Sequence, residues 1–200
     1  MEVPSNSIKT AMTSESRTYL ALGDSMSIDL YTGVRGGGAV SQFYKSLGPS
    51  WALDDRTVDM CRMRYVPASA KGNLITMTIG GNDLLADQNR YLKEGVDSFA
   101  QEHLELLRTI RTTNPNAFII VGNVYAPQML LPDHLLQALE EANAVIASNV
   151  KAVSAYLADI RQAFCGHEKE YLCYDIEPSL KGATVIAGLF QNALAKAGSQ

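Results

Sequence analysis

Runs of apolar and β-branched residues constrain the fold of this 200-residue chain more than any other feature. Three strong runs occupy residues 19–25 (YLALGDS), 73–83 (NLITMTIGGND) and 118–127 (FIIVGNVYAP), and each ends in residues that favour turns. Continuous apolar runs of this length are typical of strands that are buried on both faces of a parallel sheet. Residues 171–176 (YLCYDI) predict a further strand, and residues 56–60 (RTVDM) predict a weaker one.

Helical patterns separate these runs. Apolar residues recur every three or four positions over residues 92–110 and 135–160, so each segment makes one apolar stripe. Asp133 is the predicted N-cap of the second helix, and residues 179–195 predict a last helix. The alternation predicts an α/β protein, a three-layer, doubly wound sandwich of about five parallel strands with flavodoxin-like topology.

Length and composition favour one folded domain, since 200 residues with 46% hydrophobic content can bury a substantial core. Residues 1–17 are polar and rich in Ser and Thr, which predicts a flexible tail ahead of a single domain over residues 18–200. The net charge of −4 argues against nucleic-acid binding, which needs a basic surface.

No apolar run reaches the roughly 20 residues that a membrane-spanning helix needs, and the N-terminus lacks the apolar core of a secretory signal. We therefore expect a cytoplasmic protein without a membrane span. The three cysteines have no metal-binding spacing, so we expect free thiols and no metal. The sequence carries no signal of the oligomeric state.

The polar residues that follow the strands should meet at one edge, because open α/β sheets bind ligands beyond the carboxyl ends of their strands. Ser25 follows the first apolar run and Asn82 follows the third strand, while Tyr125 follows the fourth. Glu177 follows the fifth predicted strand. The topology therefore predicts that Ser25, Asn82 and Glu177 converge.

Two of these residues have both a chemical and a structural interpretation. Ser25, at a strand-to-helix turn, suits a nucleophile whose own N–H helps to bind an oxyanion, but it also suits a helix N-cap. Asn82 follows two glycines, so its amide can approach a ligand closely, but asparagine is also common in turns.

Three stretches together resemble the SGNH hydrolases, also called GDSL-type esterases and lipases: ALGDSMS, TIGGND and IEPSLKGATVIA. The resemblance extends from residue 19 to about residue 190. It implies the SGNH hydrolase fold, with Ser25 as nucleophile and Asn82 as oxyanion donor. We expect the substrate site to include four neighbouring residues: Asp24, Gly81, Tyr125 and His134.

The chain departs from the family's pattern at three places. Glu177 stands at the position of the catalytic His, and Tyr174 stands at that of the catalytic Asp. The glycine that usually follows the second strand is missing. We expect the backbone N–H of Met60 or Cys61 to replace its contribution to the oxyanion hole, because every residue except proline has one.

Glu177 is the candidate base for the serine. An ordinary Glu, with a pKa of about 4.3, is a weak base, but burial or a nearby carboxylate raises its pKa. Asp175 would lie on the same strand face as Glu177 if this segment were extended, and would then share protons with it. Two alternatives stay open: Glu177 caps the last helix, or His134 approaches Ser25 as the base.

The sequence therefore predicts a serine hydrolase of ester bonds that acts on a small ester, a thioester or a sugar O-acetyl group. It needs no metal or organic cofactor, and its partner is a small-molecule substrate. One alternative is a weakened or inactive SGNH-fold binding or regulatory protein that keeps the acyl pocket. Another is an anion-binding module that uses the glycines at positions 36–38.

Overall fold

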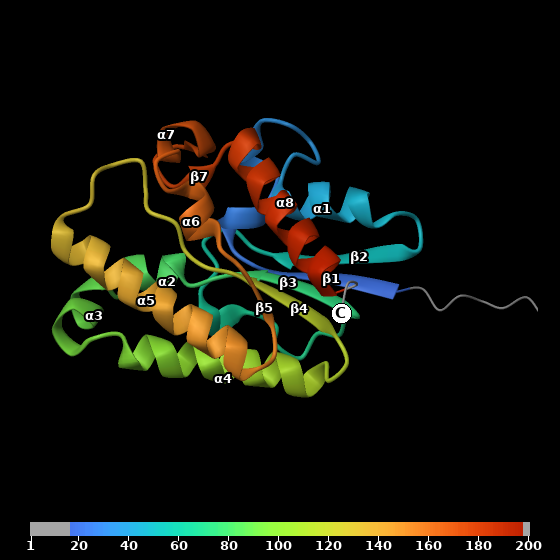
Figure 1. Ribbon diagram of the computed structural model, residues 1–200, viewed down its shortest axis with the longest axis horizontal. Coiled ribbons are helices and arrows are strands. Elements are labelled where there is room, and N and C mark those ends of the chain that lie inside the picture. The colour runs from blue at the N-terminus through green and yellow to red at the C-terminus, as the bar shows by residue number, and fades with distance from the viewer. Residues whose placement is uncertain (1–16, 198–200) are drawn as a thin grey trace, which may run out of the picture.

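The protein is described by a computed structural model that covers residues 17–197 (Figure 1). The predicted tail, residues 1–17, lies outside this range except for Arg17, which begins the first strand.

Five parallel strands form the central sheet, in the order β2-β1-β3-β4-β5. This order confirms the predicted doubly wound α/β topology. The strands are β1 (Arg17–Gly23), β2 (Trp51–Thr57), β3 (Leu74–Thr78), β4 (Phe118–Gly122) and β5 (Tyr156–Ala158).

Helices cover both faces of the sheet, so the predicted three-layer arrangement is confirmed (Figure 1). In Figure 1, α1 and α8 lie above the sheet together with α6 and α7, while α4 and α5 lie below it. The helices are α1 (Ala39–Leu47), α2 (Gly81–Ala86), α3 (Gln88–Glu94), α4 (Asp97–Thr113), α5 (Asp133–Ala152), α6 (Ile160–Phe164), α7 (Glu168–Tyr171) and α8 (Leu180–Ala197). Three short 3-10 helices are η1 (Ser25–Ser27), η2 (Leu30–Thr32) and η3 (Met63–Tyr65).

The core has one layer on each side of the sheet because successive side chains of a strand point to opposite faces. In β1, Leu20 and Leu22 pack with the α4 and α5 side, whereas Tyr19 and Ala21 pack with the α1 and α8 side. All four side chains are at most 1% exposed. The continuous apolar run in β1 therefore follows from burial on both faces.

The prediction of a fifth parallel strand at residues 171–176 was wrong. Residues 172–173 form β6 (Leu172–Cys173), which pairs antiparallel with β7 (Glu177–Pro178) in a separate hairpin. Tyr174 and Asp175 form its turn with φ angles of 46° and 72°. A turn in the left-handed region ends the extended conformation that the apolar pattern had indicated.

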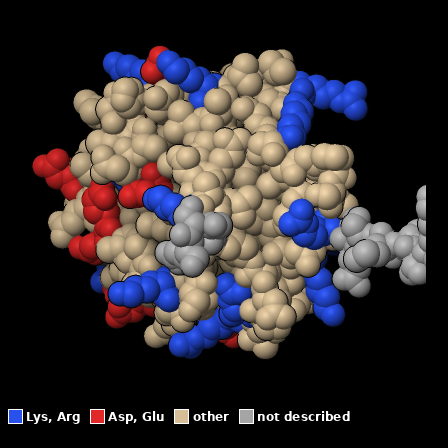
Figure 2. All heavy atoms as spheres, turned by 45° about the vertical axis from the view of Figure 1, so that its right-hand side comes forward, with Lys and Arg blue, Asp and Glu red and all other residues tan. Residues whose placement is uncertain are grey.

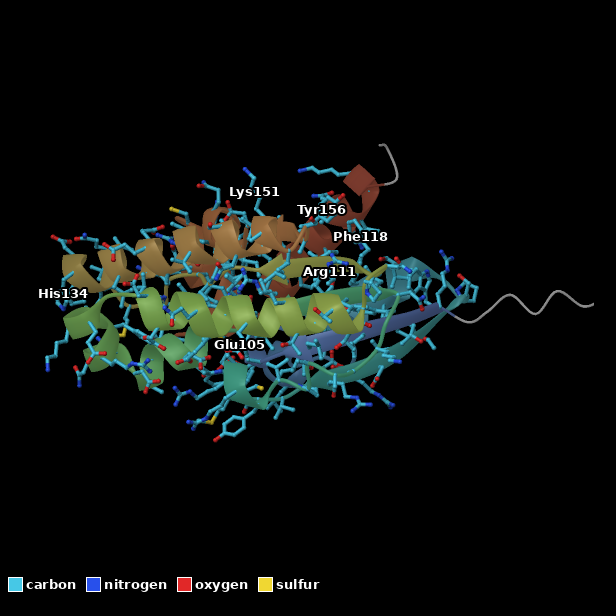
Figure 3. All side chains as sticks on the ribbon, turned by 90° about the horizontal axis from the view of Figure 1, so that it is seen from below. Glu105, Arg111, Phe118, His134, Lys151 and Tyr156 are labelled. Carbon is cyan, nitrogen blue, oxygen red and sulfur yellow. The ribbon has the colours of Figure 1, made fainter. Side chains whose placement is uncertain are left out.

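The fifth strand of the sheet is β5, which lies inside the segment predicted as helix. The helix α5 ends at Ala152, and Arg111 from α4 donates hydrogen bonds of 3.0 Å to the carbonyls of both Val153 and Ser154 (Figure 3). The rings of Phe118 and Tyr156 on the neighbouring strands then pack with centroids 4.3 Å apart. The helical spacing of apolar residues continues through this short strand, which hid it in the sequence.

The structure also differs from the sequence predictions in the bounds of β2 and in the N-cap of α5. The edge strand β2 is residues 51–57 rather than 56–60, and its side chains are partly exposed, so its apolar pattern is weak. The N-cap of α5 is Pro132, while Asp133 is the first helical residue.

Charged side chains are dispersed over the face seen in Figure 2. Acidic side chains gather on the left of that view, and the visible basic side chains do not merge into one continuous surface. Within residues 17–197, no helix is both long and apolar enough to cross a bilayer.

Candidate active site

The turn after β1 places Ser25 at the carboxyl edge of the sheet. Gly23 ends the strand with a φ of 126°, and a Cβ there would lie 2.0 Å from the Thr78 carbonyl oxygen. The next N–H, of Asp24, donates to the same oxygen at 2.9 Å. Only glycine fits this close approach. The chain then enters η1, which leaves the Ser25 side chain half-buried.

Asp24 is the N-cap of η1. Its carboxyl accepts a hydrogen bond of 3.1 Å from the Met26 N–H, and it is only 1% exposed. Burial raises the pKa of Asp24 well above its ordinary value. This residue also lines the cavity beside Ser25. The structure thus gives Asp24, which we predicted for the substrate site, a structural role in the turn that carries Ser25.

Asn82 reaches the same site from the first turn of α2. Its amide nitrogen donates a hydrogen bond of 3.1 Å to the Cys61 carbonyl, which fixes the side chain against the loop after β2. The amide has two protons, so one is left for a ligand in the cavity that Asn82 lines.

The loop after β2 lacks the glycine that SGNH hydrolases usually have there. Met60, in this loop, nevertheless has the left-handed backbone conformation that favours glycine. Met60 has a φ of 58°, and its side chain is 75% exposed. The Cys61 N–H already donates to the Val58 carbonyl at 3.1 Å. Of the two backbone donors that we expected, Met60 is therefore the better candidate.

Asp83 holds this loop against α2. Its carboxylate accepts hydrogen bonds from the Met63 N–H at 3.1 Å and from Nε of Arg62 at 3.3 Å. Arg62 also forms a salt bridge with Asp87. The guanidinium is thereby engaged in fixing the loop.

Glu177 lies beside Ser25, as the topology predicted, although it arrives on the β6–β7 hairpin rather than on a sheet strand. The strand β7, which carries Glu177, packs against η1, which begins at Ser25. Glu177 is 8% exposed, and its Oε2 is buried with no hydrogen-bond partner in the described structure. Burial is the largest influence and raises the pKa of Glu177, hydrogen bonding to Ser25 opposes this, and the charge of Asp59 raises it further.

Asp175 does not accompany Glu177, so the prediction that the two share a strand face was wrong. Its Oδ1 accepts a hydrogen bond of 2.9 Å from the Met129 N–H, and its carbonyl accepts one of 2.9 Å from the Gln128 N–H. The positive φ angles of the hairpin turn direct Asp175 toward the 128–129 loop.

Asp59 is the carboxylate that sequence reasoning missed. It follows β2 at the carboxyl edge, and its Oδ2 accepts a hydrogen bond of 3.0 Å from the Tyr31 hydroxyl. Its Oδ1 is buried and has no partner in the described structure. The topological rule that selected Ser25 and Asn82 would have selected Asp59 too, had β2 been placed correctly.

None of the three histidines lines the cavity beside Ser25. His103 is fully buried in α4, and burial lowers its pKa to about 4. His134 is exposed in the first turn of α5 and lies at the far end of this helix in Figure 3. His167 is exposed and lies beside Glu170. The structure therefore does not support His134 as the base or as part of the substrate site.

An apolar cavity of about 160 Å³ opens beside Ser25 and Asn82. Gly81 and Tyr125, both predicted for the substrate site, line it. The Tyr125 hydroxyl donates a hydrogen bond of 2.7 Å to the Ile176 carbonyl, so its ring presents mainly apolar surface to the cavity. Most of the remaining wall is aliphatic and comes from α2, α3, α5 and the loop before α5: Leu84, Leu85, Leu92, Leu131, Leu135 and Leu139.

The glycine-rich stretch does not present a free anion cradle. The Asp29 carboxylate accepts hydrogen bonds from the Gly36 N–H at 2.7 Å and from the Gly38 N–H at 2.8 Å. A protein carboxylate thus occupies the donors that a phosphate would need, which overturns the anion-binding alternative.

The part of the chain that the structure describes contains no group of three or more His, Cys, Asp or Glu residues arranged for a metal ion. Its three cysteines are free thiols.

Comparison with known proteins gives a clear result at the level of fold. No family model matches the chain, and no curated protein matches its sequence. Among solved structures, phospholipase A1 from Streptomyces albidoflavus is similar with a TM-score of 0.75 and 17% identity, over 89% of this chain and 99% of that one. A protein from Parabacteroides merdae described as a GDSL-like lipase has a TM-score of 0.74 and 14% identity, over 90% and 96% of the two chains.

A mutant of an acetyl-xylooligosaccharide esterase from a Geobacillus species has a TM-score of 0.68 and 16% identity, over 89% of this chain and 94% of that one. The chain thus has the SGNH hydrolase fold that these lipases and esterases share.

Proposed function

We propose that this protein is a serine hydrolase of acyl esters in which Glu177 takes the place of the usual histidine. The observation that carries the proposal is the buried Glu177 carboxylate on β7, which packs against η1 where Ser25 lies. Hydrogen bonding to Ser25 lowers the pKa of this carboxylate. It lies beside a cavity that Ser25 and Asn82 both line. A nucleophile bonded to a base, next to an amide donor, is the minimal set for acyl transfer.

In the proposed reaction, Ser25 Oγ attacks the acyl carbon while its proton passes to Glu177. The oxyanion that forms is held by the backbone N–H groups of Ser25 and Met60 and by the amide of Asn82. The bond from Asn82 to the Cys61 carbonyl fixes this donor in advance, which favours the transition state. Glu177 then returns its proton to the leaving oxygen, and a water that it activates releases the acyl group.

The environment of Glu177 makes it a better base than an ordinary glutamate. A base is most effective when its pKa approaches the working pH, and burial shifts the pKa of Glu177 in that direction. The base must be ionised before it can accept a proton. Activity should therefore rise with pH through a pKa that lies above the ordinary value for Glu.

The wall of the cavity supports an acyl chain longer than acetyl as the preferred group. Apart from the Ser25 edge, Gln88 is the polar side chain in this wall, and the aliphatic side chains would bury methylene groups at about 0.8 kcal/mol each. The fold relatives include lipases and a phospholipase A1 as well as an esterase of acetylated sugars, so the fold alone does not select among them. No metal or organic cofactor enters the proposed reaction.

A fluorophosphonate probe followed by peptide mapping tests the nucleophile directly. We expect labelling at Ser25, and we expect p-nitrophenyl ester hydrolysis that is lost in Ser25→Ala but kept in Ser50→Ala, which removes an exposed serine. Labelling elsewhere, or hydrolysis that survives in Ser25→Ala, would refute the proposal.

One observation favours a second candidate, a binding protein that has lost turnover: no histidine lines the cavity. This candidate predicts neither labelling nor hydrolysis between about pH 4 and pH 9, the range over which an ordinary and a strongly shifted Glu would both titrate. It also predicts that fatty acids raise the melting temperature. Hydrolysis at any pH in this range that depends on Ser25 excludes it.

A further inference from the structure

A second carboxylate approaches Glu177 from a segment that the catalytic motifs do not include. Asp59 lies in the loop after β2, close enough for its charge to raise the pKa of Glu177. Within residues 17–197, Glu177 forms no salt bridge. Two acidic side chains in one partly buried site need a structural cause, because their mutual repulsion disfavours folding.

Tyr31 supplies part of that cause. Its hydroxyl donates a hydrogen bond of 3.0 Å to Asp59 Oδ2, and this bond is the main reason that the pKa of Tyr31 is raised to about 12. At neutral pH the phenol therefore keeps its proton and acts as a donor to the carboxylate.

The β6–β7 hairpin in turn holds Tyr31. The Cys173 thiol donates a weak hydrogen bond of 3.5 Å to the Tyr31 carbonyl, and the Tyr174 ring packs edge-on against the Tyr31 ring with centroids 6.2 Å apart. The same hairpin carries Glu177. The β6–β7 hairpin therefore contacts Tyr31, the hydrogen-bond donor to Asp59, and also carries Glu177.

Unsatisfied oxygens mark both carboxylates. Asp59 Oδ1 and Glu177 Oε2 are each buried without a hydrogen-bond partner in the described structure, while the second oxygen of Asp59 is bonded to Tyr31. A buried carboxylate oxygen without a partner is unfavourable, so such atoms are uncommon unless function requires them.

We propose that Asp59 is a positioning residue for Glu177: it holds the Tyr31 hydroxyl, and Tyr31 in turn contacts the β6–β7 hairpin and so helps to hold Glu177 beside Ser25. This inference rests on the proposed function, and it assigns to Asp59 the supporting task for which the sequence had suggested Asp175. Asp59 exchanges no proton in the reaction. The proton moves from Ser25 Oγ to Glu177 and then to the leaving oxygen, so the cycle is balanced without it.

The other titratable groups around Glu177 define what a pH experiment reports. Asp24 approaches from η1, Cys173 from the hairpin and Tyr125 from the segment after β4, and the charge of Glu177 raises the pKa of each. Tyr31 approaches from η2 and is influenced in the same way. None of these groups is a cation, and hydrogen bonding to Ser25 is the influence that lowers the pKa of Glu177.

The pH dependence of kcat/KM for a p-nitrophenyl ester tests the inference. We expect Asp59→Asn to move the acidic limb to lower pH, because removal of the neighbouring charge lowers the pKa of Glu177. Above both limbs we expect kcat/KM to fall by about tenfold, because the base is weaker. Tyr31→Phe should shift the limb in the same direction by less, since Asp59 then loses its donor.

Glu105→Gln is the matched control, because it removes one negative charge from the exposed face of α4, where Figure 3 shows Glu105. It should leave the limb in place. An acidic limb that stays unchanged in a folded Asp59→Asn protein would overturn the inference. If Asp59→Asn does not fold, an unchanged limb in Tyr31→Phe has the same consequence.

A second measurement separates this inference from the proposed function. The ionisation of Glu177 is followed by carboxyl ¹³C NMR in protein labelled at Glu, with the resonance assigned by its loss in Glu177→Gln. The midpoint should move to lower pH in Asp59→Asn even if the wild type proves inactive, in which case only the proposed function fails. An unmoved midpoint in an active enzyme refutes the role of Asp59 alone.

Discussion

Ser25 and Glu177 lie on two segments that pack together, η1 and β7, and Glu177 is only 8% exposed. The two residues come from opposite ends of the chain, one from the turn after β1 and the other from the hairpin before α8. A buried carboxylate differs from a histidine because burial raises its pKa rather than lowering it. Burial thus brings a weak base closer to neutral pH.

Replacement of the base tests this relationship. Glu177→Gln should lower kcat by about 10²- to 10⁴-fold, the usual contribution of a general base, while KM changes little. The variant should also be more stable than the wild type at neutral pH, because it removes a buried charge. Ester hydrolysis and thermal melting measure the two effects. A kcat equal to that of the wild type would assign the base to another group.

The pH dependence of stability provides a test that does not need activity. Since the folded-state pKa of Asp24 lies above its unfolded-state value, its contribution is most favourable at low pH. This contribution declines as the pH rises from the unfolded pKa through the folded one. Asp24→Asn imitates the protonated acid, so its melting temperature should fall less than that of the wild type over this range. Equal slopes would contradict the burial effect.

Met60 occupies a backbone conformation that suits glycine. Its φ of 58° costs a side-chain residue roughly 1 kcal/mol. Met60→Gly should therefore stabilise the protein by up to about that amount, less the greater flexibility of the unfolded glycine. It should keep its activity, because the backbone N–H remains. Val58→Gly, in the same loop, is the control and should only destabilise. Urea unfolding and kcat/KM distinguish these outcomes.

Chain-length preference tests the apolar cavity. Ala138 on α5 lines the cavity, so Ala138→Trp should fill it. Hydrolysis of an octanoyl ester should fall by at least about tenfold, which corresponds to the loss of two or more buried methylene groups, whereas an acetyl ester should react as before. Ala144→Trp places the same ring on the exposed side of α5 and should change neither rate. Equal losses for both esters would indicate a general disturbance.

A substitution at Asp175 tests whether this carboxylate supports Glu177, as the sequence suggested, or only holds the 128–129 loop, as the structure shows. Asp175→Asn weakens a bond to the Met129 N–H, so it should cost about 1 kcal/mol of stability or less. Because this side chain faces the 128–129 loop, the acidic limb of the pH profile should not move. A shift as large as that of Asp59→Asn would restore Asp175 as the partner of Glu177.

The strong apolar runs were sufficient to predict β1, β3 and β4, and with them the edge at which Ser25 and Asn82 lie. Burial on both faces of a sheet is visible in the order of the residues, because it requires apolar side chains at every position of a strand. The glycines of GGND and LGDS likewise indicated tight turns, and both turns contain a glycine with positive φ.

The last strand and the partner of Glu177 depended on tertiary structure. Residues 156–158 became a strand because Arg111 fixes the preceding turn and β4 offers an open edge, and neither influence is local in sequence. Asp59 meets Tyr31 for a similar reason, since this contact depends on how the loop after β2 packs against η2. The sequence determined which residues could carry the chemistry. The packing of remote segments decided which of them meet, because electrostatic interactions depend on distance in space and not on separation along the chain.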